Sequence, residues 1–123
     1  GLDVVVHNAG ITRDKSLRRM TAAQFASVVA VNATAVQDVT ERLLSEGLLN
    51  RDARVVALSS INGIAGAFGQ LNYAASKAAL IGYVDAMAPR LAALGATINA
   101  IAPGFIETEM TAAVPVVARN VGR

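Results

Sequence analysis

The chain has 123 residues, of which 54% are hydrophobic and 16% are charged, and its formal net charge at pH 7 is +2. This composition is too apolar for a disordered tail, and the small charge does not indicate a nucleic-acid or membrane-surface protein despite a pI near 9.5. The absence of cysteine excludes disulfides and thiolate chemistry and suits a cytoplasmic location. The length predicts one domain, and the sequence contains neither a signal-peptide pattern nor an apolar run of membrane-helix length.

Three short apolar runs predict β-strands, at residues 4–6, 54–59 and 97–101. Unalternated β-branched runs such as Val4-Val5-Val6 are typical of parallel strands that are buried on both faces. Residues 60–71 contain a glycine at every third position from Gly63 to Gly69 and are expected to form a loop.

Two longer segments have the periodicity of helices. Thr21 and Gln24 form a capping-box pattern, so a helix is expected from residue 21 to about residue 46, with Gly47 ending it. A second helix is expected over residues 72–94, with a kink at Pro89 and an end at Gly95, and Thr111 is expected to begin a last helix. The apolar stripe of the first helix is expected to hold Phe25, Val28, Val29, Val36, Val39 and Leu43.

The alternation of strands and helices predicts an α/β fold in which right-handed crossovers connect the strands of a parallel sheet. Three strands are few for a parallel sheet, which is normally covered and bounded on its sides. The sequence is therefore interpreted as an incomplete copy of a larger α/β domain.

One group of polar residues stands out for its chemistry. Tyr73 and Lys77 are four residues apart on a predicted helix and so share a face. An ammonium group beside a phenol stabilises the phenolate, which allows a tyrosine to act as a general acid or base. Ser60 follows the second strand, at the edge where doubly wound sheets bind ligands, and its hydroxyl can hydrogen-bond a substrate carbonyl. By spacing alone, a purely structural role for the Tyr73–Lys77 pair is an open alternative.

Five motifs also occur in order along the chain. They are Asn8-Ala9-Gly10 after the first strand, Asn32, Ser60, Tyr-Ala-Ala-Ser-Lys at residues 73–77, and Pro-Gly-Phe-Ile-Glu-Thr at residues 103–108. Together they resemble the short-chain dehydrogenase/reductase family over essentially the whole chain, and they are most similar to its β-ketoacyl-[acyl-carrier-protein] reductases. The resemblance implies a partial Rossmann-like, doubly wound parallel sheet, with residues 1–123 forming the central and C-terminal part of one domain.

The resemblance also implies a role for each matching residue. Tyr73 would exchange a proton with the substrate oxygen, Lys77 would stabilise the phenolate and hold the nicotinamide ribose, and Ser60 would polarise the substrate carbonyl. Asn32 would anchor a water that relays protons between Lys77 and solvent. The residues expected to contact the cofactor are Asn8, Ala9, Gly10, Tyr73, Lys77, Pro103, Gly104, Ile106 and Thr108.

The activity implied by the resemblance is NADPH-dependent reduction of a 3-oxoacyl thioester in fatty acid biosynthesis, with NAD(H) as the other cofactor choice. Two alternatives stay open: a short-chain dehydrogenase for a sugar alcohol, steroid or small ketone, and a truncated, non-catalytic fragment. The glycine-rich phosphate loop, the first three strands and the last strand of the family are absent from the 123 residues. These residues alone are therefore expected to bind NADP(H) poorly and to be inactive.

The expected partners are an acyl thioester substrate, an acyl carrier protein that delivers it, and a second copy of the chain. Members of the family pair through the helices that begin here near Thr21 and Asn72, which implies a homodimer or homotetramer. Similar enzymes dock acyl carrier protein on basic residues near Arg51 and Arg54, but Leu94 stands where many have a second basic residue, so coenzyme A esters are an alternative carrier. The basic residues between positions 13 and 19 are expected to form a solvated loop, or else to steer an anionic substrate. No metal site is expected, because His7 is the single histidine and has no second ligand at suitable spacing.

Overall fold

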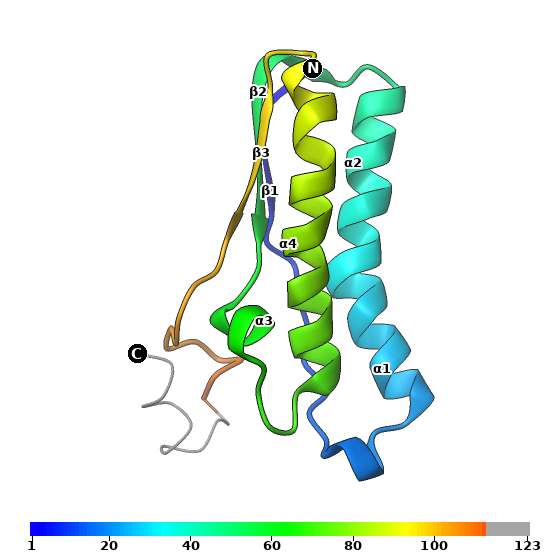
Figure 1. Cartoon of the computed structure of the whole chain (residues 1–123), viewed down its shortest axis with the longest axis vertical. Helices are drawn as coiled ribbons and strands as arrows, with labels where there is room; N and C mark the ends of the chain where they lie inside the picture. Colours follow the sequence, from blue (N-terminus) through cyan, green and yellow to red (C-terminus); the bar gives the residue numbers. More distant parts are fainter. Residues whose placement is uncertain (113–123) are drawn as a thin grey trace.

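A three-stranded parallel sheet with strand order β1-β2-β3 forms the centre of the computed structural model, which describes residues 1–112. The paired positions include Val5 with Val55 and Val55 with Ile98, so consecutive strands lie side by side. The predicted α/β fold is confirmed as a partial Rossmann-like sheet with flanking helices (Figure 1). The elements are β1 (Leu2–His7), the 3₁₀ turn η1 (Leu17–Arg19), α1 (Ala22–Val29), the π-helical segment η2 (Ala30–Thr34), α2 (Ala35–Ser45), β2 (Leu49–Leu58), α3 (Ile61–Ala65), α4 (Leu71–Ala92) and β3 (Thr97–Ile101).

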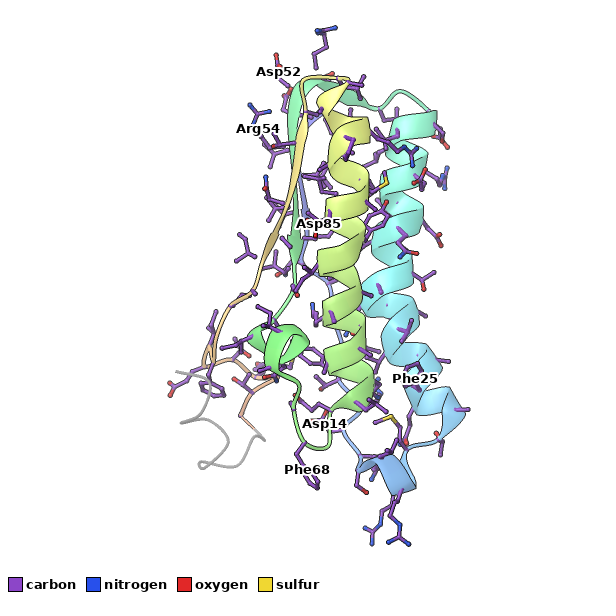
Figure 2. The ribbon with its side chains drawn as sticks, in the orientation of Figure 1. Asp14, Phe25, Asp52, Arg54, Phe68 and Asp85 are labelled. Carbon is purple, nitrogen blue, oxygen red and sulfur yellow. The ribbon has the colours of Figure 1, made fainter. Side chains whose placement is uncertain are left out.

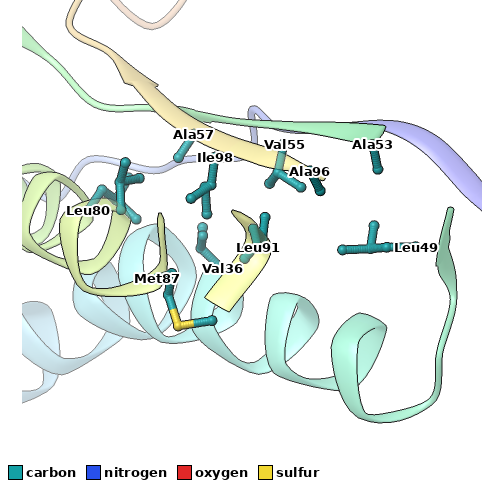
Figure 3. Close-up of a cluster of buried hydrophobic side chains, with 11 residues drawn as sticks. Val36, Leu49, Ala53, Val55, Ala57, Leu80, Met87, Leu91, Ala96 and Ile98 are labelled. Carbon is teal, nitrogen blue, oxygen red and sulfur yellow. The ribbon is translucent and has the colours of Figure 1, made fainter. Parts of the chain in front are cut away.

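The hydrophobic core lies between one face of the sheet and the helices α2 and α4. Val55 and Ile98 from the sheet meet Val36 from α2 and Leu80 and Leu91 from α4, and all five are buried (Figure 3). The buried residues of α4 recur every three or four positions, as a helix with one face on a sheet requires. This packing orients α4 so that its amino-terminal half runs past the carboxyl ends of the strands.

The opposite face of the sheet is open in the described part of the chain, so the prediction that both faces are buried is wrong there. Val4 is 61% exposed and Val6 is 55% exposed, and Ile101 on β3 is also exposed. The reason is visible in Figure 1, where α1, α2 and α4 all lie on the other side of the sheet. In a doubly wound fold a second layer of helices would cover these side chains.

The predicted helix over residues 21–46 is present, but the π-helical segment η2 divides it. The Thr21 capping box forms as predicted: the Gln24 amide donates to Oγ1 of Thr21, and the Thr21 amide donates to Oε1 of Gln24. The single apolar stripe is wrong, because Phe25 and Val39 are exposed while Val28 and Val36 are buried. Phe25 is three positions from Val28 on α1, and Val39 is three positions from Val36 on α2. Three positions turn a helix by about 300°, so the exposed residue of each pair lies about 60° from the buried one, outside the buried face.

Several element boundaries also differ from those predicted. Ser60 caps a short helix, α3, inside the segment expected to be a loop, and β2 begins five residues earlier than expected. Helix α4 continues through Pro89 as a single element. Thr111 lies in a turn, and the continuation of the expected last helix falls on residues 113–123, outside the described residues. In residues 1–112 no helix has the length and apolarity needed to span a membrane.

Candidate active site

A cleft of about 640 Å³ lies at the carboxyl ends of the three strands. Its walls come from the turn after β1, the end of β2 with the start of α3, the first turns of α4 and the segment after β3. This edge of a parallel α/β sheet is where such folds bind ligands, and the volume suits a ligand of ordinary size. The cleft brings together every predicted site residue except Asn32, namely Asn8, Ala9, Gly10, Ser60, Tyr73, Lys77, Pro103, Gly104, Ile106 and Thr108.

Tyr73 and Lys77 lie one turn apart on α4 and both line the cleft. Lys77 Nζ is 5.7 Å from the centroid of the Tyr73 ring, and it donates a 2.6 Å hydrogen bond to the main-chain oxygen of Leu58. Lys77 is only 4% exposed, and its burial lowers the pKa of the amine, because a low-dielectric environment disfavours the charged form. The amine thus lies beside the Tyr73 ring, and its hydrogen bond to Leu58 holds it at the end of β2.

Ser60 is the N-cap of α3, and its Oγ accepts a 3.2 Å hydrogen bond from the Asn62 amide. This contact uses a lone pair of the hydroxyl oxygen and leaves the hydroxyl proton for donation. Because Ser60 is nearly buried at the base of the cleft, a carbonyl oxygen in the cleft can accept that proton in a hydrogen bond.

Asn32 lies behind the cleft, fully buried in the π-helical segment. Its Oδ1 accepts from the Ile11 amide at 2.8 Å, and its Nδ2 donates to the Ile11 oxygen at 3.0 Å and to Ser76 Oγ at 3.1 Å. The side chain therefore joins the segment after β1 to α4. The proton-relay role that the resemblance implies for Asn32 stays a prediction.

Gly10 separates the cleft from Asn32. A Cβ placed on Gly10 would lie 3.4 Å from Asn32 Oδ1 and 3.5 Å from Lys77 Nζ, so a side chain there would fill the space beside the amine. The space is thus open to a ligand hydroxyl that accepts from Lys77, which fits the ribose of a nicotinamide cofactor. The sequence has no Gly-x-x-x-Gly-x-Gly loop to hold the pyrophosphate, so the fit extends only to the nicotinamide half.

Two other polar residues of α4, Asn72 and Ser76, support the site and were not predicted. Asn72 is fully buried; its Nδ2 donates to the main-chain oxygens of Arg13 and Gln24, and its Oδ1 accepts from the Tyr73 amide at 2.8 Å. Ser76 accepts from Asn32 and donates to the Tyr73 oxygen at 2.8 Å. Their spacing in the sequence could have indicated this role, because Asn72 and Ser76 are each four residues apart from the next and lead to the core residue Leu80. Polar side chains on the buried face of a helix need hydrogen-bond partners.

The basic residues considered for carrier docking lie far from the cleft. Figure 2 places Arg54, with Asp52 beside it, at the opposite end of the sheet from Asp14 and Phe68, which lie near the amino-terminal end of α4. Arg54 pairs with Val4 in the sheet, and six residues of extended chain, about 20 Å, separate it from Ser60.

Comparison with known proteins defines the class. Residues 1–116 match the family described as short chain dehydrogenase, and the chain belongs to that family. It is 48% identical over 115 residues to acetoacetyl-CoA reductase of Rhizobium meliloti (93% of this chain, 47% of that protein). It is 46% identical over 112 residues to 3-oxoacyl-[acyl-carrier-protein] reductase of Aquifex aeolicus (91% and 45%), and 43% identical over 113 residues to nodulation protein G of Azospirillum brasilense (92% and 46%). The chain spans about half the length of these curated relatives.

Proposed function

We propose that these residues form the catalytic part of an NADPH-dependent reductase that converts 3-oxoacyl thioesters into 3-hydroxyacyl thioesters in fatty acid biosynthesis. The observation that carries this proposal is the meeting of Ser60, Tyr73 and Lys77 in one cleft at the carboxyl ends of the strands. Two of the similar proteins are an acetoacetyl-CoA reductase and a 3-oxoacyl-[acyl-carrier-protein] reductase, which supports a 3-oxoacyl thioester as the substrate.

In this proposal the protein orients the ketone and supplies a proton. The Ser60 hydroxyl donates a hydrogen bond to the 3-oxo oxygen and stabilises the negative charge that develops there. The Tyr73 hydroxyl transfers its proton to the same oxygen as the alcohol forms, and the Lys77 amine stabilises the resulting phenolate. When bound, NADPH supplies the hydride to the 3-carbon. Lys77 would hold the nicotinamide ribose, and the Ile106 main chain and Thr108 would hold the nicotinamide end. The turn of Asn8, Ala9 and Gly10 would touch the adenosine side of the dinucleotide.

Replacement of the Tyr73 hydroxyl tests the proposal. In the complete protein that contains these residues, Tyr73→Phe should lower kcat for acetoacetyl thioesters by at least about a hundredfold, the usual contribution of a general acid. Tyr83→Phe is the matched control, because Tyr83 lies on the same helix outside the cleft, and it should keep most of the activity. Assays with NADPH and NADH would establish the cofactor preference. Retained turnover in Tyr73→Phe would refute the proposed acid.

We also propose that residues 1–123 are one part of a single domain and do not suffice for cofactor binding. The reason is the absence of a phosphate-binding loop from the sequence. Titration of NADPH fluorescence with the purified 123-residue chain should give no saturable change, whereas the complete protein should bind. NADPH-dependent ketone reduction by the 123-residue chain, with its mass verified, would overturn this.

The carrier and the oligomeric state are proposed on charge and exposure. An acyl carrier protein, which is acidic, would need basic residues such as Arg51, so Arg51→Glu should impair reduction of the carrier-bound ketone more than reduction of the coenzyme A ester. If Arg51→Glu changes the rates on the two substrates equally, coenzyme A is favoured as the carrier.

Phe25 and Val39 expose apolar surface on α1 and α2, which supports pairing of two copies through these helices and α4. A monomeric mass of the complete protein in sedimentation would contradict pairing.

A further inference from the structure

The segment that carries Ser60 lies against the main chain of α4 at Lys77 and Ala78. The Ser59 hydroxyl donates a 2.6 Å hydrogen bond to the Lys77 oxygen, and Ser59 is buried. Four residues later, Gly63 lies directly against the same part of α4. A Cβ placed on Gly63 would lie 2.8 Å from the Lys77 carbonyl carbon and 2.8 Å from the Ala78 nitrogen.

These contacts lie on both sides of Ser60 in the sequence. The Gly63 amide also donates to the Ser60 oxygen at 2.9 Å, which closes the turn between them. Ser60 is therefore held against α4 by a hydrogen bond before it and a close approach after it. Because Tyr73 lies one turn before Lys77 on α4, the same contacts determine how far the Ser60 hydroxyl lies from the Tyr73 ring.

The requirement for glycine at position 63 comes from this approach and not from the backbone conformation. Gly63 lies within helix α3 and is not among the glycines with positive φ. A Cβ at Gly82, on the outer face of α4, would meet nothing within 4 Å, so glycine has no such role there. An added Cβ at Gly63 would instead meet main-chain atoms, which cannot rotate away as a flexible side chain can.

We propose that Ser59 and Gly63 are positioning residues, which set the separation of Ser60 from Tyr73 and Lys77 and so allow both hydroxyls to reach one substrate oxygen. This inference rests on the proposed reductase function and adds to it two residues that do not themselves touch the substrate oxygen. A displacement of about 1 Å between reacting groups can lower a rate by about a hundredfold, so the proposed effect is large enough to measure.

The test is a double-mutant cycle in the complete protein. Gly63→Ala should lower kcat by at least about tenfold with little change in the KM for NADPH. If Gly63 acts through Ser60, then Gly63→Ala should lower kcat by less than about threefold when Ser60→Ala is already present, because the misplaced hydroxyl is gone. Gly82→Ala is the matched control and should leave kcat unchanged. Ser59→Ala should lower kcat less than Gly63→Ala does, and Ser59→Thr, which keeps the hydroxyl, should restore part of the loss.

A purely structural role would give a different pattern. Equal effects of Gly63→Ala with and without Ser60, or equal rates for Gly63→Ala and Gly82→Ala, would overturn the proposal. If Gly63→Ala does not fold, the Ser59→Ala and Ser60→Ala pair gives the same cycle, and additive effects there would overturn it too.

A second readout does not depend on turnover. NMR titration of the ¹³C-labelled Lys77 side chain should show its pKa moving up towards the ordinary lysine value in Gly63→Ala, because separation of α3 from α4 lets water reach the amine. An unchanged titration would count against positioning, whereas absence of reductase activity in the unmodified protein would count only against the proposed function.

Discussion

The fully buried Asn32 side chain should be one of the largest single contributors of polar contacts to stability. It makes three hydrogen bonds, two with the Ile11 main chain and one with Ser76, and these connect the segment after β1 to α4. Each intramolecular hydrogen bond contributes about 0.5–1.5 kcal/mol net, so Asn32→Ala should lower the free energy of unfolding by about 1.5–4.5 kcal/mol. The upper part of this range is expected, because the partners left behind are partly buried and the truncation leaves a cavity.

Urea unfolding followed by circular dichroism, on the complete protein, measures this change. Asn50→Ala is the matched control: its Nδ2 donates to Asp3 Oδ1 at 2.8 Å near the surface, and its loss should change the free energy of unfolding by no more than about 0.5 kcal/mol. Hydrogen exchange of the Ile11 amide should also become faster in Asn32→Ala, since that amide loses its acceptor. A cost for Asn32→Ala no larger than that for Asn50→Ala would refute the reasoning.

Two further predictions concern the core and the single histidine. Leu91→Ala should lower the free energy of unfolding by about 2–5 kcal/mol, measured in urea, because Leu91 is fully buried. Leu48→Ala, at an exposed site, should lower it much less. Similar losses for the two variants would mean that Leu91 does not belong to the hydrophobic core. Burial lowers the pKa of His7 in the folded state, so the unfolded state binds the proton more readily and stability should fall as the pH drops below about 6.5. His7→Asn should show a smaller loss of unfolding free energy between pH 7.5 and pH 5.5, and an equal loss would exclude His7 as the cause.

The π-helical segment connects stability with the site. An extra residue in the helical turn lets Asn32 face inward, where its amide satisfies both polar groups of Ile11. Such segments are often found at functional sites, and here the segment supports the stretch after β1 that contains Gly10. No periodicity in the sequence indicates this turn, because a regular helix is the default for an amphipathic segment with a good N-cap.

The order of the elements, the parallel sheet and the residues of the cleft could be predicted from the sequence, because they depend on local signals. Apolar runs, the Thr21 capping box and the four-residue spacing of Tyr73 and Lys77 each act over a few residues, and the ends of parallel strands must meet at one edge. The roles of these residues came from the resemblance of the five motifs to a known family, and not from the local patterns.

The tertiary structure alone decided the features that depend on residues far apart in the chain. The exposure of Val4 and Val6 depends on which face of the sheet the helices cover, and a strand run looks the same in either case. The contacts of Ser59 and Gly63 with Lys77 join residues 14 to 18 positions apart, on different elements. Close packing between elements has no period or motif in the sequence, so the separation of the groups in the cleft becomes visible only when the helices are packed on the sheet.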